Sequence, residues 1–337
     1  MTRISLAQAN ARHITVDVEG YDATPAWAIA GEATHVIASD TGDALLLVTP
    51  NDATVYDVET GDMRDRHAMS PGDTAQVTAV ATSTGFVVKR HDTLSVWSDD
   101  TGWRHGDIDA KATLLSRGGI AVAVSPKEEY SLVKDDATMM AVTRPGNEAT
   151  LITVTPTHVV WEEKRRVTVT ARGDATPGGR DVPLTSDGDM KLDRAVGADE
   201  KHVYGLWRQG DTASLSSHDI TTGDLVDSNS VTLGDDEHPF LSTHGETFHA
   251  YANVTIDALA GAITPVPTGQ PMTIAAGEGF VTATETRATI LHPKKQIVET
   301  ITVPKGTVVT AVSNRGLILT TPQGVIALTP TQKETKK

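Results

Sequence analysis

The chain has 337 residues and contains no cysteine. Disulfide bonds, zinc sites built from thiolates and cysteine nucleophiles are therefore excluded. Neither an oxidising nor a reducing compartment is indicated, because a protein without disulfides can occupy both. The cellular location is left open by this absence.

Aromatic residues and long apolar runs are also scarce. Phe, Trp and Tyr together make up 4% of the chain, so its core must consist mainly of Val, Leu, Ile and Ala. No run approaches the roughly 18 apolar residues that span a bilayer. The N-terminal MTRISLAQANARH lacks the apolar centre of a secretory signal. We expect a soluble chain without a membrane span, and an anchor trimmed from a longer protein is compatible with the same sequence.

Acidic side chains outnumber basic ones. The chain has 44 Asp and Glu against 29 Lys and Arg, which gives a formal net charge of -15. An acidic surface repels phosphate backbones. We therefore expect no nucleic-acid partner.

A repeated unit runs along the chain. Each copy has a strand, a short turn that often contains Gly, and a strongly aliphatic second strand, and successive copies are about 40 residues apart, a period typical of radial arrays and solenoids. The copies lie at 34–48, 76–88, 112–124, 150–161, 192–207, 238–252, 272–284 and 307–321.

Third and fourth strands follow most of these pairs. PNDATVYDV, RHDTLSVWS and PQGVIALTP are examples of a polar turn and a third strand, and weaker segments such as QIVETITV follow as the fourth. Four short antiparallel strands joined by Gly, Asp, Asn and Pro turns are typical of a propeller blade, and helical periodicity is absent. The sequence predicts an all-β propeller of four-stranded antiparallel blades. Eight blades fit the count, and seven are the alternative if the 238–264 unit is miscounted.

The domain boundaries follow from closure of the ring. The last unit ends after its third strand, and RHITVDV at 12–18 precedes the first unit without a partner of its own. We expect this N-terminal segment to be the outer strand of the last blade, because that pairing removes an exposed edge. The prediction is an N-terminal arm at 1–11, a single propeller domain at 12–330 and a loose polar tail at 331–337.

A six-residue motif that occurs twice, far apart in the chain, resembles that of a known family. YDVETG at 56–61 and HDITTG at 218–223 resemble the quinoprotein-type (PQQ-like) propeller repeat, whose third strand ends in a similar LDxxTG. WD40 repeats are the next nearest match, but their Gly-His and Trp-Asp signatures are absent. Enzymes of the quinoprotein type hold their cofactor against a vicinal disulfide and a calcium ion. The resemblance therefore implies, for a chain without cysteine, a non-catalytic member without a cofactor.

Histidines and carboxylates gather in DDEHPFLSTHGETFH. Such ligands suit zinc and other transition metals, although the spacing does not predict that they converge. We interpret them as ordinary polar residues at strand ends and assign no metal site. The residues concerned are Asp235, Asp236, Glu237, His238, His244 and His249.

Charged turns join the second and third strands of several units. In a propeller these turns project from one face, which is the face where most propellers bind. The turn EEKRR at 162–166 follows a Trp, and Arg and Trp are enriched in binding hot spots. Solvated charges on tight hairpins are the simpler interpretation, and core packing is the expected role of Trp97, Trp161 and Trp207. The candidate partner-binding residues are Arg90, His91, Trp161, Glu162, Glu163, Lys164, Arg165, Arg166, Arg208 and Arg287.

Two main functions remain open. The first is a non-catalytic scaffold, expected to be a monomer, that binds another protein through its turn-rich face. By the resemblance, many such propellers work in cell-envelope assembly. The second is a small-molecule hydrolase of the lactonase or glycosidase kind, with Asp235, Asp236, Glu237 and His238 at the central channel. We favour the scaffold because no nucleophile elbow, P-loop or dinucleotide motif occurs. A ligand-sensing ectodomain of a longer membrane protein is a further alternative.

Overall fold

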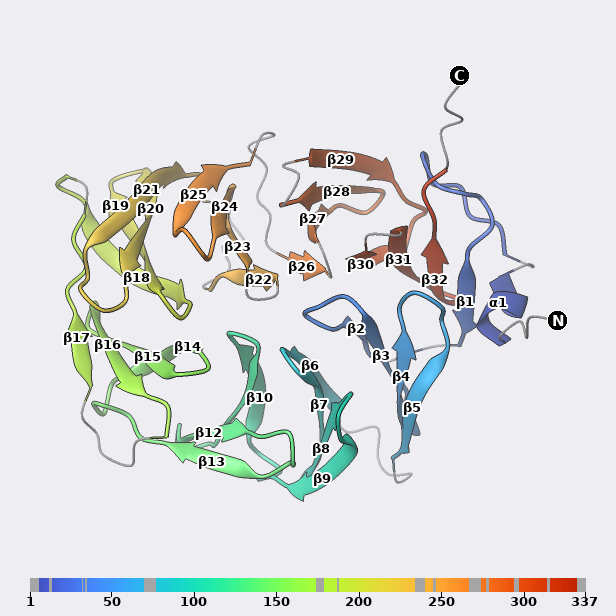
Figure 1. The fold of residues 1–337 in the computed structure, drawn as a ribbon, viewed down its shortest axis with the longest axis horizontal. Coiled ribbons are helices and arrows are strands. Elements are labelled where there is room, and N and C mark those ends of the chain that lie inside the picture. The colour runs from blue at the N-terminus through green and yellow to red at the C-terminus, as the bar shows by residue number, and fades with distance from the viewer. Residues whose placement is uncertain are drawn as a thin grey trace.

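The aliphatic runs of the sequence form short antiparallel strands, and four strands make one sheet (Figure 1). The computed structural model of the protein describes residues 6–11, 14–31, 33, 35–69, 77–173, 179–186, 188–233, 240–244, 247–266, 274–276, 279–293, 297–313 and 316–331. Within these ranges there are eight four-stranded sheets in a ring, which confirms the eight-bladed propeller. The 238–264 unit is a genuine blade, so the seven-bladed alternative is wrong.

The blades are numbered in chain order, and each runs from the ring centre outward. Blade 1 is β2 (His35–Ala38), β3 (Ala44–Val48), β4 (Asp52–Asp57) and β5 (Met63–Ala68); blade 2 is β6 (Val77–Thr82), β7 (Gly85–Arg90), β8 (Thr93–Ser98) and β9 (Gly102–Asp107); blade 3 is β10 (Thr113–Arg117), β11 (Ile120–Val124), β12 (Tyr130–Val133) and β13 (Met139–Val142); blade 4 is β14 (Thr150–Val154), β15 (His158–Glu163), β16 (Arg166–Ala171) and β17 (Arg180–Val182).

The second half of the ring repeats the pattern. Blade 5 is β18 (Lys191–Ala198), β19 (His202–Gln209), β20 (Thr212–Asp219) and β21 (Leu225–Val231); blade 6 is β22 (Ser242–His244), β23 (Phe248–Tyr251), β24 (Val254–Asp257) and β25 (Ala262–Pro265); blade 7 is β26 (Ile274–Ala276), β27 (Gly279–Ala283), β28 (Arg287–His292) and β29 (Ile297–Thr302); blade 8 is β30 (Val308–Ser313), β31 (Gly316–Thr321), β32 (Gly324–Leu328) and β1 (Trp27–Ala30). The short helix α1 (Leu6–Ala11) packs beside β1. In the described ranges, no helix is long and apolar enough to cross a bilayer.

The hydrophobic core lies between the blades. Strand β3 shows why: Leu46 packs toward blade 2, whereas Leu45 and Leu47 pack toward blade 8. A central strand covered on both faces is therefore aliphatic at every position, as the run ALLLV is. Trp97, Trp161 and Trp207 are all buried, which confirms their expected role in core packing.

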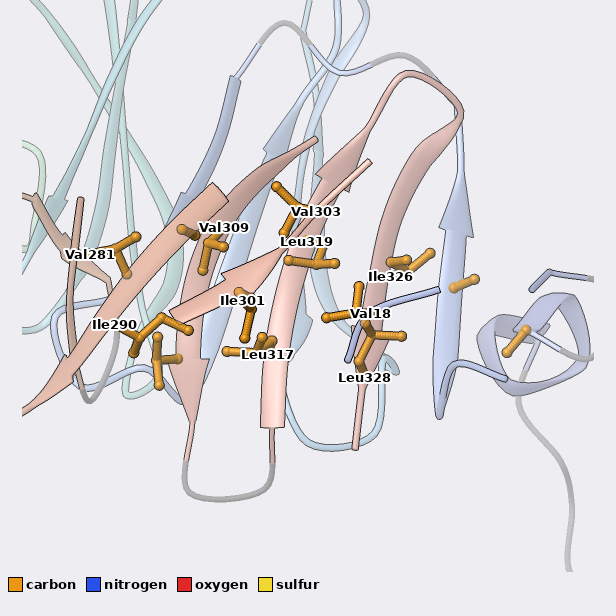
Figure 2. Packing of buried hydrophobic residues seen from close by; sticks show 14 residues of the cluster. Val18, Val281, Ile290, Ile301, Val303, Val309, Leu317, Leu319, Ile326 and Leu328 are labelled. Atoms are coloured by element: carbon orange, nitrogen blue, oxygen red, sulfur yellow. The ribbon is translucent and has the colours of Figure 1, made fainter. Parts of the chain in front are cut away.

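The ring is closed by an N-terminal strand, but not by the predicted residues. The outer strand of blade 8 is β1, which pairs with β32 from Trp27↔Ala327 to Ala30↔Gly324. Residues 14–18, part of the predicted 12–18 strand, form no strand. Their alternating Ile14, Val16 and Val18 instead pack against the cluster between blades 7 and 8 (Figure 2). The alternation of apolar residues at 14–18 therefore arises because these side chains are packed against the core, although their backbone pairs with no strand.

Gly324 allows the closing strand to approach. It has a φ of 141°, and a Cβ at this position would lie 2.1 Å from the carbonyl oxygen of Ile29. We expect Gly324→Ala to reduce the free energy of unfolding by about 2–4 kcal/mol, because backbone strain and a clash with backbone add. Gly210, with a φ of 59° and no atom within 4 Å of the same point, is the control. Gly210→Ala should lose only about 1 kcal/mol. Equal losses in urea denaturation would contradict this account.

The repeated motif, YDVETG and HDITTG in the sequence, forms the same turn in both places. Asp57 ends β4, and its Oδ1 accepts hydrogen bonds from the backbone N–H groups of Glu59 and Thr60, both at 2.9 Å. Asp219 ends β20 and does the same for Thr221 and Thr222, at 2.7 and 2.8 Å. These hydrogen bonds close the turn between the third and fourth strands of a blade.

A further copy of this turn is hidden in IDALAGA. Asp257 accepts from the N–H of Leu259 at 2.8 Å, and the Gly261 N–H bonds to the Asp257 carbonyl at 2.7 Å. Gly261 has a φ of 67°, close to the 70° of Gly61 and the 79° of Gly223. The shared requirement is an Asp followed four residues later by a Gly, without the Thr of the other copies.

Candidate functional site

The predicted partner-binding residues lie in or near the turns between second and third strands, with Trp161 and Arg208 still inside the second strands. These turns share one end of the ring, because each blade starts at its innermost strand and alternates direction. They come from blades 2, 4, 5 and 7, and residues 90–91 and 161–166 form the two contiguous sets. The structure thus places them on one face, spread around the ring.

Trp161 is not available to a partner. Its exposed fraction is 0%, and its indole Nε1 donates to Thr170 Oγ1 at 3.1 Å within the interface between blades 3 and 4. The expectation that it forms part of the binding surface is wrong. It is the last apolar residue of β15 and follows the buried Val159 and Val160, so its nearness in sequence to a charged turn does not expose it.

Several of the other candidates connect neighbouring blades. Glu162 Oε2 accepts from the Ala195 N–H of blade 5 at 2.9 Å, and burial raises the pKa of this carboxyl. Arg90 donates to the carbonyl of Pro50 in blade 1 at 2.8 Å. Arg208 Nε donates to Asp193 at 2.9 Å on the innermost strand of its own blade. The side chains of Glu162, Arg90 and Arg208 thus form contacts within the propeller itself.

The exposed candidates lie at the turn tips. Lys164 and Arg165 have φ values of 51° and 67°, as expected of the two central residues in a tight hairpin turn. Lys164 pairs with Glu148 at 2.9 Å, and Arg166 pairs with Asp181 at 3.4 Å, both in exposed positions where ion pairs contribute little. The remaining candidates lie at or beside turns on the face formed by the turns between second and third strands. They are His91, Glu163, Arg165 and Arg287. Their part in binding stays a prediction.

A cavity of about 890 Å³ opens on the opposite face. Its walls are the turns between the first and second strands of blades 1 to 6, together with outer turns of blades 3, 4 and 6. These turns surround the ring centre in Figure 1. Representative lining residues are Asp40, Ser83, Gly119, Thr155, Asp199 and Thr247. The cavity therefore exists only because the ring brings six separate turns together.

Side chains from non-neighbouring blades meet at the ring centre beside this cavity. Arg117, which ends β10 of blade 3, places its guanidinium carbon 4.0 Å from the ring centroid of Phe240, which precedes blade 6. A guanidinium over an aromatic face is a favourable cation–π contact, especially away from water. Burial lowers the pKa of Arg117. Gly118 and Gly119, the next residues, line the cavity.

A buried carboxylate forms one wall of the cavity. The Asp199 side chain is 13% exposed, and its Oδ1 accepts from the N–H groups of Lys201 and His202 at 2.7 and 2.8 Å. The Tyr204 hydroxyl donates to Oδ2. Burial works to raise the pKa of Asp199, but the nearby imidazoles of His202 and His249 and the Tyr204 hydroxyl outweigh it and hold that pKa well below its usual range. Asp199 is thus an anion at neutral pH.

Two imidazoles flank this anion. His202 Nδ1 lies 3.3 Å from Asp199 Oδ1, and His249 Nε2 lies 3.5 Å from Asp199 Oδ2. His249 is 4% exposed and lines the cavity, yet neither of its ring nitrogens has a hydrogen-bond partner in the described part of the chain. A buried polar atom without a partner is unusual in native proteins and calls for an explanation. The pair is a candidate point of contact for a ligand.

Asp40 provides a second carboxylate from another blade. It lies in the first turn of blade 1, and no described residue forms a hydrogen bond or ion pair with its carboxylate. Burial raises the pKa of Asp40 to about 6. Asp40 and Asp199 are therefore two carboxylates with opposite pKa shifts in one cavity.

The predicted histidine cluster is only partly described. Asp235, Asp236, Glu237 and His238 lie outside the described residues, as does the side chain of His244. His249 is in β23 and contacts Asp199 of blade 5. No group of three or more His, Asp and Glu in the described ranges is placed to hold a metal ion.

Comparisons with known proteins agree on the fold. No protein-family model and no curated protein matches the sequence. Among solved structures, the C-terminal WD40 domain of Sif2 is 10% identical, with 94% of this chain and 99% of that chain covered and a TM-score of 0.55. The WD40 domain of SCAP from fission yeast (10% identity, 98% and 97% covered, TM-score 0.48) and apo AztD from Citrobacter koseri (10%, 89% of both chains, 0.45) also match. The chain thus shares the β-propeller fold with the Sif2 domain, and likeness at this identity shows the fold alone.

Asp40 and Asp199 were absent from the residues that the sequence singled out, and His249 was interpreted there as an ordinary polar residue at a strand end. Asp40, Asp199 and His249 lie in different blades, and each belongs to an ordinary polar turn or strand. The position of a turn within its repeat could have identified them. In a ring of eight repeats, the turns that follow the innermost strands all lie around the ring centre on one face. Listing the polar residues of those turns would have singled out Asp40 and Asp199.

Proposed function

We propose that the protein is a non-catalytic binding scaffold that takes a segment of a partner protein into its central cavity. The observation that carries this proposal is the cavity itself, with about 890 Å³ between the turns of six blades. This volume lies within the roughly 300–1,000 Å³ of typical ligand sites. The turns are held by the blade cores, so little ordering opposes binding.

The rim supports a protein partner over a small molecule alone. Leu259 borders the cavity and is 67% exposed, in the outer turn of blade 6. Lys134 and Lys201 are also exposed there. A molecule confined to the cavity would leave this leucine in water, whereas a partner surface around an inserted segment would cover it. Protein interfaces commonly combine apolar contacts with a polar rim.

The charged turns of the other face remain a second proposed surface. Lys164, Arg165, Arg166 and Arg287 are exposed there without forming a cavity wall. They would suit an acidic partner, but their spread around the ring gives no single point of contact. The quinoprotein-like assignment of the repeat, and the cell-envelope location that it implies, also remain predictions. The recurring Asp and Gly turn supports that assignment.

A hydrolase is the second candidate, because one cavity holds carboxylates with opposite pKa shifts. Such separation is the usual mark of a general acid and a general base. The two carboxyl groups of glycosidases, however, lie within about 10 Å of each other so that they act on one bond. Asp40 and Asp199 come from blades 1 and 5, on opposite sides of an eight-bladed ring. Binding is the function that this arrangement supports better.

Site-specific crosslinking tests the proposal. A photoreactive benzoyl-phenylalanine is placed at Leu259 on the cavity rim, at Arg165 on the other face and at Met63, which is exposed on outer strand β5. After irradiation in an extract of the source cells, we expect one defined partner peptide joined to position 259 and none joined to position 63. Mass spectrometry identifies the joined peptide.

A blocked cavity provides the control. Thr41 is exposed and lines the cavity, so Thr41→Trp should suppress the crosslink at position 259, whereas Thr93→Trp at an exposed position of the other face should not. A crosslink restricted to position 165 would assign the partner to the charged turns. That result, or a crosslink unaffected by Thr41→Trp, would overturn the cavity proposal.

A further inference from the structure

We infer that the group which enters the cavity is an ammonium ion, held by the Asp40 carboxylate, with His249 accepting a second hydrogen bond from the same ligand. This inference rests on the proposed function, because it names the chemistry that the cavity selects. An ammonium group has three donors and no acceptor, so it requires a site of acceptors. The source is a lysine or N-terminal amine of a partner protein, or a free amine.

Asp40 reaches into the ring centre from blade 1. A Cβ at Gly119, in the first turn of blade 3, would lie 3.0 Å from Asp40 Oδ2, so the carboxylate approaches the main chain of a blade two positions away. Gly119 has a φ of 73°, which favours glycine at this close approach. No described residue pairs with the Asp40 carboxylate. A half-buried carboxylate without a counter-ion is stabilised by a cation from outside.

Carboxylates are in slight excess among the charges that line the cavity. Asp40, Asp135, Asp199 and Glu200 face Lys134, Arg172 and Lys201, and of these seven groups only Asp40, Asp199 and Arg172 are half-buried. An anionic group that entered would face two carboxylates, whereas an ammonium group would meet them favourably. The formal net charge of -15 attracts cations over a longer range. The polarity of the cavity therefore favours a cationic ligand.

His249 is an independent observation that points to a ligand donor. Because Asp199 is ionised and lies 3.5 Å from Nε2, the proton of a neutral imidazole is favoured on that nitrogen. Nδ1 then carries a lone pair, and it is buried without a partner among the described residues. An N–H or O–H of the ligand would satisfy it. The Tyr204 ring, with its centroid 5.6 Å from that of His249, packs edge-on and holds the imidazole in place.

The affinity for an ammonium group should depend on pH through Asp40. The groups on the surrounding turns are Asp43 and Thr41 in blade 1, Ser83 and Thr84 in blade 2, and Lys134 and Asp135 in blade 3. Hydrogen bonds from Thr41 and Ser39 and the charge of Arg64 hold the pKa of Asp43 low against the effect of burial, and Asp135 accepts from Thr84. Lys134, the cation among these groups, is exposed and forms no ion pair with Asp40 in the described part of the chain. With its pKa raised to about 6, Asp40 is mostly neutral at pH 5 and ionised at pH 7.5. An alkyl ammonium stays charged throughout this range.

Small amine probes test the inference directly. N-acetyl-lysine methylamide and 1,5-diaminopentane are titrated into the protein by NMR, with N-acetyl-norleucine methylamide as the uncharged analogue. We expect both amines to bind about tenfold more tightly at pH 7.5 than at pH 5, which is the ratio of ionised Asp40 when its pKa is about 6. The norleucine probe should bind more weakly and without pH dependence. Tighter binding of the lysine derivative indicates a protein source, and tighter binding of the diamine indicates a free amine.

Variants separate this inference from the proposed function. Asp40→Asn should remove the pH dependence and at least nine-tenths of the affinity, whereas Asp135→Asn, which removes the same charge at the exposed rim, should retain both. Unchanged amine binding in Asp40→Asn, or equal binding of the norleucine probe, would overturn the inference. The pH profile of the wild-type protein is a readout that does not depend on the variant folding. Loss of the Leu259 crosslink pattern would contradict the proposed function instead, whatever the amines do.

Discussion

Replacing Trp27 by Ala is expected to reduce the free energy of unfolding by about 3–5 kcal/mol, the usual range for loss of a buried aromatic side chain. Trp27 is 1% exposed and lies on β1, the strand that closes the ring. Its indole Nε1 donates to the carbonyl of Val58 in blade 1 at 3.0 Å. The ring also packs where a Cβ at Gly61 would lie 2.6 Å from Trp27 Cγ. One side chain thus joins the closing strand of blade 8 to the first blade.

Two further variants identify the origin of this loss. Trp27→Phe keeps most of the buried area but removes the hydrogen bond to Val58, so it should lose less than Trp27→Ala. Trp103→Ala affects an indole on outer strand β9 that is only partly buried, and it should be much less destabilising. The measurement is urea denaturation followed by tryptophan fluorescence and circular dichroism. Equal effects of Trp27→Ala and Trp103→Ala would contradict a special role for the closure.

Most of the fold was predictable because each blade is a local unit. Strands of one blade follow one another in sequence, so alternation of aliphatic runs and Gly or Asp turns reports directly on the sheet. Closure of the ring by an N-terminal strand was predicted correctly, but the strand was assigned to residues 12–18, whereas the structure forms it from Trp27–Ala30. The four residues WAIA give a weaker pattern than ITVDV. Only the pairing with β32, at the far end of the chain, distinguishes a hydrogen-bonded strand from a segment that buries alternate side chains.

The candidate site was much less predictable, because it is a product of the ring. Asp40 and Gly119 approach each other across two blades, and Asp199 and His249 meet across one blade boundary. Sequence spacing carries no information on such contacts. Trp161 illustrates the opposite error: the charged turn beside it suggested a surface, whereas its place in an aliphatic strand meant burial. The density of charged residues in the sequence drew attention to the face with the charged turns. The cavity lies on the opposite face, where turns of six blades converge in three dimensions.

Removal of the Asp199 carboxylate should also be strongly destabilising, by about 3–5 kcal/mol at pH 7, because breaking a buried charged network leaves its donors unpaired. In Asp199→Ala the Tyr204 hydroxyl and the N–H groups of Lys201 and His202 lose their acceptor. Asp219→Ala is the matched control. Asp219 also accepts two backbone N–H bonds in a turn, but it is only partly buried and accepts from no buried hydroxyl, so its loss should be much smaller.

The pH dependence distinguishes charge from shape in this network. The folded-state pKa of Asp199 lies below the value of about 3.9 expected for an unfolded Asp. Stability from the ionised carboxylate is therefore fully present above about pH 4 and is lost as the pH falls through the depressed folded-state pKa. The difference between wild type and Asp199→Ala should be about 1 kcal/mol smaller at pH 3 than at pH 7, measured by urea denaturation at both values. A difference that stays the same would mean that the carboxylate contributes as a hydrogen-bond acceptor of the right shape, without net stabilisation from its charge. Its neighbour His249 would then have no fixed tautomer, and a ligand donor at Nδ1 would lose its physical basis.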